Sequence, residues 1–185
     1  METPIFDQML SGSWYNAADP ALVKELRQCQ QECFEINQMP PSRMAERNGR
    51  IARLLGKAGK GLQVNTPFFC DYGRNTEVGD NFFANFNLVI LDEAKVTFGD
   101  NVFIGPNCSF YTAIHPLDPT ERNKAIEKAE PITVGDSVWF GGGVTVLPGV
   151  TIGSGTTIGA GSVVTKDIPS GVVAVGNPCR VIRRL

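Results

Sequence analysis

The feature that most constrains the fold is an apolar residue that recurs every six positions. From Val134 to Val164 the step is unbroken, and two shorter runs upstream keep the same spacing. Neither an α-helix nor a heptad repeat has this period. A sustained step of six predicts a parallel β-solenoid, in which each hexad forms a short strand and a turn. The repeat residues are Val78, Ala84, Ile90, Phe98, Ile104, Phe110, Val134, Phe140, Val146, Ile152, Ile158 and Val164.

Polar phrases that follow the apolar residue predict the corners of the solenoid. They read "VGDNFF" from 78, "FGDNVF" from 98, "VGDSVW" from 134 and "IGSGTT" from 152. Glycine, aspartate and asparagine favour tight turns, so three hexads would make one triangular coil with its apolar residues inside. The glycine-rich stretches 141–144 and 153–159 could instead suggest a phosphate-binding loop. Both keep the six-residue phase and lack a following helix pattern or a suitably spaced lysine, which argues against that alternative.

The repeat is interrupted at two places. It slips by two residues after Ile90, and it stops altogether over about 112–131, a polar, charged segment bounded by prolines. We expect this segment to be a loop that projects from the solenoid. Long loops inside compact domains are usually functional, and this one carries His115, the single histidine of the chain.

The N-terminal part of the chain has a helical pattern instead. Asp19 followed by Pro20 is a favourable helix start, and "QMPPS" at 38–42 ends that helix because proline cannot continue it. Ser42 could cap a second helix, which Gly59 and Gly61 would stop. The expected apolar stripes are Leu22, Leu26, Cys29, Cys33 and Ile36 on the first helix, and Met44, Ile51, Leu55 and Ala58 on the second.

These patterns divide the chain into three segments. Residues 1–60 form a helical segment, 61–168 form the solenoid with its loop, and 169–185 close it. The closing segment ends in "CRVIRRL", which gives a basic terminus to a slightly acidic protein.

Composition narrows the classes of function. The 185 residues include 17 basic and 19 acidic side chains, for a net charge of −2, which argues against a general nucleic-acid or membrane-surface binder. No apolar run approaches the roughly 18 residues of a membrane-spanning helix, and "METPIFDQML" does not resemble a secretory signal. Five scattered cysteines suit free thiols in a reducing cytoplasm. Cys29 and Cys33 have no histidine cluster beside them, so we expect packing rather than metal binding.

Together, "FFANFN", the His-Pro loop, "PITVGDSVW" and "GNPCRVIR" closely resemble the sugar O-acetyltransferases of the hexapeptide-repeat superfamily, which include maltose, galactoside and nodulation acetyltransferases. The resemblance covers almost the whole chain. It implies a mainly β fold, a left-handed parallel β-helix with an N-terminal helical segment. It also implies a homotrimer with acetyl-CoA as the acetyl donor. Phe83 and Ala17 stand where the galactoside branch has hydroxyl-binding groups, which favours a maltose-type or an unassigned acceptor.

The predicted catalytic group is His115. A hydroxyl is a poor nucleophile near neutral pH, and a histidine can remove its proton during attack on a thioester. The resemblance adds Asn85, to hold the acceptor hydroxyl, and the backbone N–H of Gly142, to stabilise the oxyanion. Structural alternatives are a histidine that satisfies only a loop hydrogen bond, an asparagine at a coil corner, and glycines that allow close packing of coils.

The resemblance also implies the binding residues. Trp139 and Ala160 would line the channel for the pantetheine arm, with Gly142 beside them. The phosphates of CoA would meet cationic and hydroxyl groups from Thr165, Lys166, Arg180 and Arg183. The alternatives are a solvated basic tail for the arginines and a trimer contact for Trp139.

The acceptor site is expected at Asp71, Phe83, Asn85, Asp92 and Glu127, with Tyr15 and Asp19 closing over it. Glu127 could orient the imidazole of His115 or form only a surface ion pair.

The sequence therefore predicts acetyl transfer from acetyl-CoA to a maltose- or glucose-type hydroxyl, by direct attack in a ternary complex with no acylated side chain. An antibiotic or other xenobiotic hydroxyl is the alternative acceptor, and serine is a weaker one. Metal hydration through three histidines does not fit a chain with one histidine, and no metal is expected. A non-catalytic solenoid scaffold is the remaining alternative.

Overall fold

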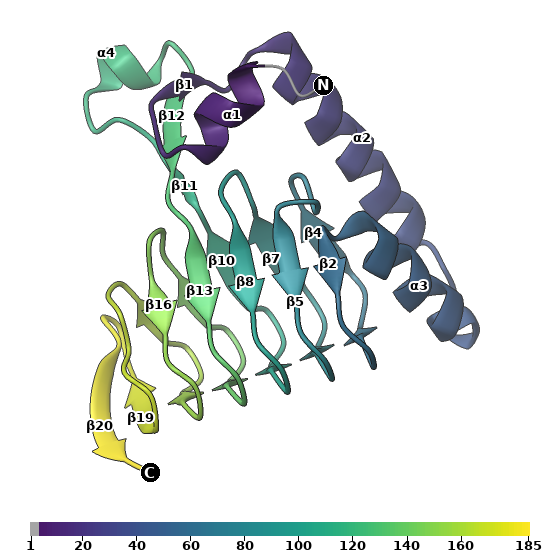
Figure 1. Cartoon of the computed structure of the whole chain (residues 1–185), viewed down its shortest axis with the longest axis vertical. Helices are drawn as coiled ribbons and strands as arrows, with labels where there is room; N and C mark the ends of the chain where they lie inside the picture. Colours follow the sequence, from purple (N-terminus) through teal and green to yellow (C-terminus); the bar gives the residue numbers. More distant parts are fainter. Residues whose placement is uncertain (1–3) are drawn as a thin grey trace.

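The computed structural model describes residues 4–185, and it confirms the predicted solenoid (Figure 1). Short strands, parallel except for the antiparallel pair β19 and β20, wind through three sheets, which we call the first, second and third faces. The first face contains β2 (Lys57–Ala58), β5 (Thr76–Val78), β8 (Val96–Phe98), β13 (Ile132–Val134) and β16 (Thr151–Ile152). The second contains β3 (Gln63–Val64), β6 (Phe83–Ala84), β9 (Phe103–Ile104), β14 (Trp139–Phe140), β17 (Thr157–Ile158), β19 (Val172–Val175) and β20 (Arg180–Arg184). The third contains β4 (Phe68–Cys70), β7 (Leu88–Leu91), β10 (Ser109–Tyr111), β15 (Thr145–Val146) and β18 (Val163–Val164).

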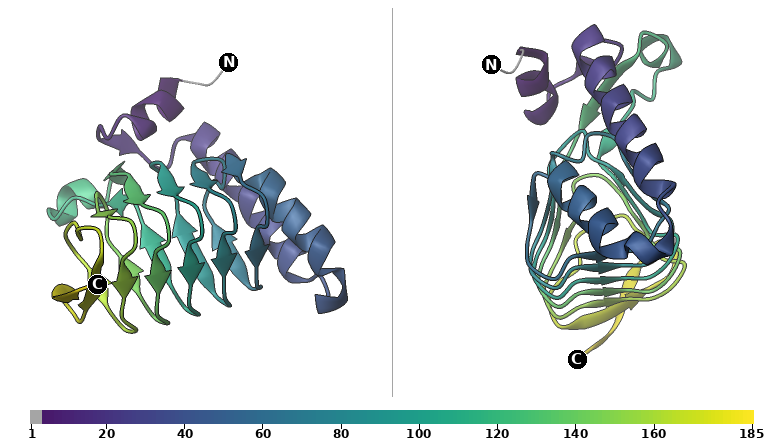
Figure 2. Two further views of the ribbon diagram at one scale, coloured as in Figure 1. Left: turned by 60° about the horizontal axis from the view of Figure 1, so that its bottom comes forward. Right: turned by 90° about the vertical axis from the view of Figure 1, so that its right-hand side faces the viewer.

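The repeat residues are all buried inside the coils. The end-on view of Figure 2 shows how the backbones of successive coils stack on one another. The ring of Phe98 packs edge-on against that of Phe110 at 4.9 Å between centroids, and Phe110 packs on Phe140 at 5.3 Å. Edge-to-face aromatic pairs add to the free energy gained from burying their area. Together, the inward repeat residues form a column of side chains that fixes the register of every coil.

Coil length differs along the solenoid, and the difference is confined to one corner. Equivalent residues are 20 positions apart before the loop, as for Asp80 and Asp100, and 18 apart after it, as for Asp136 and Ser154. In the last coil they are 16 apart, as for Thr157 and Val173. The additional residues all lie where the third face passes into the first. We call this edge of the solenoid the irregular corner; its segments are 71–75, 92–95 and 112–131.

The segment 112–131 projects from the irregular corner, but it is more ordered than a loop. It contains an antiparallel pair, β11 (Ala113–Ile114) and β12 (Ile126–Ala129), joined through the short helix α4 (Pro119–Arg122). The N-terminal β1 (Tyr15–Asn16) adds to the other edge of β12. The start of the chain is therefore bonded to the projecting hairpin (Figure 1).

Three α-helices lie in the N-terminal segment. They are α1 (Pro4–Leu10), α2 (Pro20–Asn37) and α3 (Met44–Leu54), with a 3₁₀ turn η1 (Pro41–Arg43) before α3. The predicted cap of α2 is confirmed, since the Asp19 carboxylate accepts a 2.8 Å hydrogen bond from the Ala21 amide. No helix in the described part of the chain is long and apolar enough to cross a membrane.

The prediction for the second helix was wrong at both ends. Ser42 lies within η1 and makes no capping hydrogen bond, and α3 starts after it. Ala58 belongs to β2, which pairs with β5, so the solenoid begins before residue 61. The reason is Gly56, whose amide bonds to the Thr76 carbonyl and where a Cβ would lie 2.1 Å from the Arg74 carbonyl oxygen. Such a close approach of two backbones stops the helix and starts the first coil.

Asp92 holds two segments of the irregular corner together. Its side chain is fully buried and accepts hydrogen bonds from the amides of Tyr72 and Gly73, at 2.8 and 3.2 Å, and from the Thr76 hydroxyl at 3.0 Å. Burial nevertheless raises the pKa of Asp92 from 3.8 to about 6. Desolvation of the carboxylate therefore outweighs these hydrogen bonds.

This pKa predicts how stability changes with pH. The folded chain keeps the proton of Asp92 at higher pH than the unfolded chain, so this group should lower the free energy of unfolding by about 3 kcal/mol between pH 4 and 7. Asp92→Asn should show a smaller decrease over that window when urea unfolding is measured at each pH. The exposed control Asp7→Asn should keep the wild-type dependence. Equal pH dependence in Asp92→Asn and wild type would contradict the assignment.

Candidate active site

His115 follows β11 and faces a buried glutamate on the neighbouring strand. Its imidazole is more than half exposed, and its Nε2 lies 3.7 Å from Oε2 of Glu127. Glu127 is buried, and its other oxygen accepts a hydrogen bond from the Tyr15 hydroxyl. Tyr15 and Glu127 are paired residues of β1 and β12, so the backbone register sets this contact. Burial, followed by the bond to Glu127, raises the pKa of Tyr15, which keeps its hydroxyl a donor.

Further acidic groups gather around this pair on the irregular corner. The pKa of Tyr72 is raised by burial and then by the charges of Glu93, Asp71 and Glu127. Carboxyl groups are suitable partners for the hydroxyls of a polar acceptor. Of the predicted residues, the structure pairs His115 with Glu127, and Asp71 interacts with Glu93 at the same corner.

Glu93 belongs to this group, although it was not among the site residues predicted from the sequence. Burial raises its pKa well above the usual value, and a hydrogen bond with Asp71 adds to the effect. Its Oε2 also lies 3.0 Å from the Thr112 hydroxyl. A carboxyl group that keeps its proton can donate as well as accept hydrogen bonds. The signal in the sequence was the two-residue slip after Ile90, which creates the corner that Glu93 occupies.

Asp92 has a different position from the one expected of an acceptor contact. Its side chain is fully buried and its oxygens bond the turn at Tyr72 and Gly73. The physical reason is that the extra corner residues fold over it. Asp92 therefore positions the backbone next to Asp71 and presents no surface to a ligand. Asp19 likewise serves as the cap of α2.

Asn85 and Gly142 lie at another corner, between the second and third faces. The side-chain oxygen Oδ1 of Asn85 accepts a hydrogen bond from the backbone amide of Phe86 at 2.8 Å, and the side chain is partly exposed. Among residues 4–185, no acceptor takes the N–H of Gly142, so this donor remains available. Glycine also suits the packing here, since a Cβ at 142 would come within 3.2 Å of Pro106.

The second face carries a row of outward aromatic side chains next to that corner. We call it the aromatic stripe; it consists of Phe83, Phe103 and Trp139, which pair in register on β6, β9 and β14. Phe103 and Trp139 are half exposed, and the rings of Phe83 and Phe103 lie 6.2 Å apart. Ala160 stacks directly beyond Gly141 at the same corner. Trp139, Gly142 and Ala160 thus lie on one continuous part of the surface.

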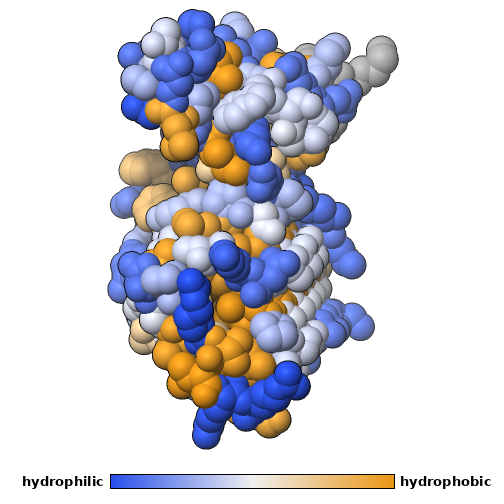
Figure 3. Space-filling model, turned by 90° about the vertical axis from the view of Figure 1, so that its left-hand side faces the viewer, coloured by the Kyte–Doolittle hydropathy of each residue, from blue (hydrophilic) through white to orange (hydrophobic). Residues whose placement is uncertain are grey.

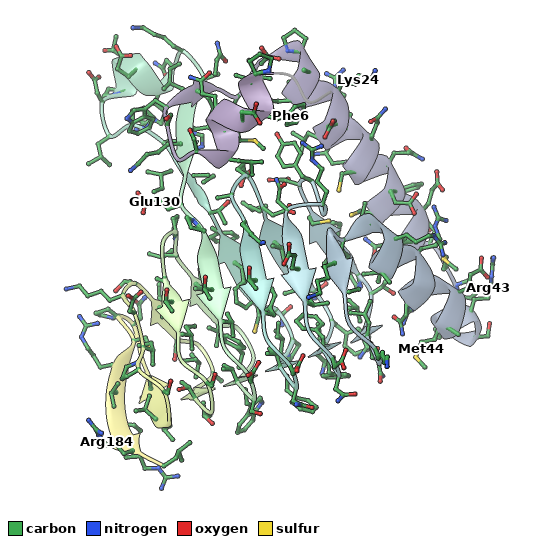
Figure 4. The ribbon with its side chains drawn as sticks, viewed as in Figure 1. Phe6, Lys24, Arg43, Met44, Glu130 and Arg184 are labelled. Carbon is green, nitrogen blue, oxygen red and sulfur yellow. The ribbon has the colours of Figure 1, made fainter. Side chains whose placement is uncertain are left out.

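The predicted phosphate-binding residues are at the C-terminal end of the solenoid. Lys166 and Arg180 line one cavity of about 210 Å³, together with Asp167. Arg183 lies on the same strand as Arg180 and pairs with Val173, and Thr165 immediately precedes Lys166. Figure 3 shows blue, hydrophilic side chains beside an apolar surface at this end, and Figure 4 places Arg184 there.

One chain does not bring all the predicted catalytic groups together. His115 projects from the irregular corner, whereas Asn85 and Gly142 lie at the opposite edge of the third face. No contact joins His115 to either residue within the described part of the chain. The coils are wound so regularly that these two edges remain apart along the whole solenoid (Figure 2).

Comparison with known proteins agrees with this architecture. Residues 8–59 match the maltose acetyltransferase hexapeptide capping motif, and residues 131–166 match the bacterial transferase hexapeptide, six repeats. A putative acetyltransferase of Saccharomyces cerevisiae is 48% identical over 182 residues, which is 98% of this chain and 93% of the yeast protein.

Two solved structures are also similar along their length. The maltose O-acetyltransferase of Clostridium difficile 630 has a TM-score of 0.96 and 48% identity, covering 98% of this chain and 97% of that one. A galactoside acetyltransferase solved in complex with coenzyme A has a TM-score of 0.94 and 39% identity, covering 99% and 92%. The chain therefore belongs to the hexapeptide-repeat acyltransferases, in the family of the maltose and galactoside O-acetyltransferases.

Proposed function

We propose that this protein transfers the acetyl group of acetyl-CoA to a hydroxyl of a maltose- or glucose-type sugar. The observation that carries the proposal is the pairing of His115 with the buried Glu127 beside a group of acidic side chains. A base that faces a polar acceptor pocket is what hydroxyl activation requires. The CoA complex of the similar galactoside enzyme supports the donor.

The reaction proceeds by direct attack within a ternary complex. The acceptor hydroxyl attacks the thioester carbonyl while its proton passes to the imidazole of His115. The carboxylate of Glu127 stabilises the imidazolium that forms, and the side chain of Asn85 holds the attacking hydroxyl. The Gly142 N–H donates to the oxyanion. Collapse of the tetrahedral intermediate forms the acetyl ester and expels the CoA sulfur, which receives the proton from His115.

The acceptor binds at the irregular corner. Asp71 accepts hydrogen bonds from sugar hydroxyls, and Glu93, with its raised pKa, contributes a donor as well. Phe83 lies at the other corner, beside Asn85, and would offer a ring face to the apolar side of a sugar bound between two copies of the chain. Phe83 and Ala17 lack hydroxyl-binding groups, which is why we favour a maltose-type acceptor over a galactoside. An antibiotic hydroxyl is the second candidate acceptor, because the same polar groups would bind it.

Acetyl-CoA binds along the solenoid at the other corner. Trp139 and Ala160 contact the pantetheine arm, which brings the thioester to Gly142. The phosphates accept charge-assisted hydrogen bonds from Lys166, Arg180 and Arg183. The hydroxyl of Thr165 donates a further hydrogen bond. The shared cavity of Lys166 and Arg180 supports this assignment.

The active protein is a homotrimer with its active sites between subunits. His115 and Gly142 lie at different corners of one chain, so a neighbouring copy is needed to bring a base to the thioester. The exposed aromatic stripe supports such a contact, because large apolar residues on a flat face favour association. The unpaired state of the five cysteines is consistent with action in the cytoplasm.

Loss of the base should abolish most turnover. His115→Ala should reduce kcat by about 10²- to 10⁴-fold, measured as CoA release from acetyl-CoA with the best acceptor. The affinity for CoA and the trimeric mass in light scattering should be unchanged, because His115 is exposed and bonds no neighbouring coil. Near-normal turnover by this variant would reject His115 as the base.

Loss of the carboxylate beside the base should affect turnover and not binding. Glu127→Gln should lower kcat on the order of tenfold, with little change in the KM for acetyl-CoA, because the amide cannot stabilise an imidazolium. Glu121→Gln is the matched control, an exposed acid in the same hairpin that pairs with Lys124. A kcat equal to that of the control would leave Glu127 with a purely structural role.

The basic end should contribute to CoA affinity. Arg180→Ala or Lys166→Ala should weaken CoA binding by about 10- to 100-fold, the effect of losing one charge-assisted hydrogen bond. Isothermal titration with CoA and with dephospho-CoA, which lacks the 3′-phosphate, separates the partners of the different phosphates. The control Lys124→Ala removes an exposed cation between α4 and β12, and it should bind CoA like wild type. Unchanged affinity in both variants would show that the basic end is only a solvated tail.

An acceptor screen tests the proposed reaction directly. Transfer rates would be compared for maltose, glucose, galactosides and hydroxyl-bearing antibiotics at one acetyl-CoA concentration. We expect the highest kcat/KM with a glucose-type sugar. A clear preference for an antibiotic would establish the alternative, and the absence of both transfer and CoA binding would indicate a scaffold.

A further inference from the structure

Three buried cysteines meet where the N-terminal helix packs on the first coil. Cys29 and Cys33 are one turn apart on α2, and Cys70 ends β4. Each is at most 5% exposed. The Sγ atoms of Cys29 and Cys70 are 3.5 Å apart, those of Cys33 and Cys70 are 3.8 Å apart, and all three lie within 4.8 Å of one another. We call these residues the thiol cluster.

The separations match those of sulfur atoms around one ion. A zinc–thiolate bond is about 2.3 Å long, so two thiolates of a tetrahedral site lie about 3.8 Å apart. Two of the three separations in the thiol cluster, 3.5 and 3.8 Å, are already close to this spacing without an ion, and the third is within 4.8 Å. From the sequence, Cys29 and Cys33 were expected only to pack, because no histidine cluster accompanies them; the structure adds Cys70 as a third thiol.

The surroundings of the cluster also suit a cation. The carboxyl group of Asp92 lies close enough to act on the Cys29 thiol through its charge. A cavity of about 650 Å³ reaches the cluster, and Cys33 and Cys70 line it together with Asp71. This cavity gives an entry path and space for a water molecule as a fourth ligand.

We propose that Cys29, Cys33 and Cys70 bind a thiophilic divalent cation, with Zn²⁺ as the ion that suits them. Three S–H groups would exchange their protons for three Zn–S bonds, releasing three protons to solvent, and a water from the cavity would complete the site. No oxidant or reductant takes part. Because the ligands come from α2 and β4, the ion would tie the helical segment to the solenoid. This site is separate from the proposed reaction, which needs no metal.

The test uses the untagged, fully reduced, metal-free full-length protein. Co²⁺ is added as a spectroscopic probe, and we expect a thiolate-to-cobalt charge-transfer band that saturates at one equivalent per chain and disappears when Zn²⁺ is added. Zn²⁺ should also raise the thermal midpoint, since an ion that binds only the folded state stabilises it. Absence of the band and of the thermal shift in the wild-type protein would overturn the proposal.

Variants then locate the site. Cys33→Ser and Cys70→Ser should weaken zinc binding at least 10-fold and lose the cobalt band. The control Cys108→Ser replaces a cysteine that is equally buried but lies outside the cluster. Equal zinc affinity in all three variants would refute the assignment to the thiol cluster.

A mass-spectrometric measurement covers the case in which the cluster variants do not fold. Wild-type protein is alkylated with and without Zn²⁺, and the rate is measured for each cysteine. Zinc should slow alkylation of Cys29, Cys33 and Cys70 and leave Cys108 and Cys179 unchanged. Equal rates with and without zinc would mean that the three thiols only pack together.

Discussion

Every part of this structure depends on the filling of the solenoid interior. One apolar side chain per hexad must occupy the space inside the coil, and it must contact its counterparts in the coils above and below. The rings of Phe98, Phe110 and Phe140 enter the interior from three different faces, and their edge-on contacts show how closely it is filled. Since packed interiors tolerate little change of volume, the column fixes where each strand lies. Once the strands are fixed, the turns that join them determine where the corner residues lie.

The functional groups occupy the positions that this column leaves free. The residues proposed to bind the donor lie where the spacing is regular, on the second face, the corner that follows it and the C-terminal end. Most residues proposed to bind the acceptor lie at the irregular corner, where extra residues leave room for buried carboxyls. The two sets lie on opposite edges of one sheet. This separation is the reason for proposing that copies of the chain share each active site, because a rigid solenoid cannot fold one edge onto the other.

Much of the fold could be predicted from the sequence, because the hexad period and the Asp19 cap depend on residues close together in the chain. The position of His115 on a projecting segment could be predicted for the same reason, since it stands in the one long break of the repeat. The end of α3 could not, because it depends on Gly56 approaching a backbone eighteen residues further along the chain. Glu93, the contact of Tyr15 with Glu127, and the thiol cluster were also beyond the sequence, since each joins segments that only the coil register brings together. The resemblance to a family indicated which residues to expect in the site, but it did not indicate that the side chain of Asp92 is fully buried.

The confinement of all length changes to one corner has a further consequence. Coils of 20 and of 18 residues pair in the same register, so residues can be added or removed at that corner without shifting a single strand. A lineage could therefore reshape the proposed acceptor site through small insertions and deletions there. The proposed donor surface would be untouched by those events. In this architecture, the proposed acceptor site can evolve independently of the proposed donor site.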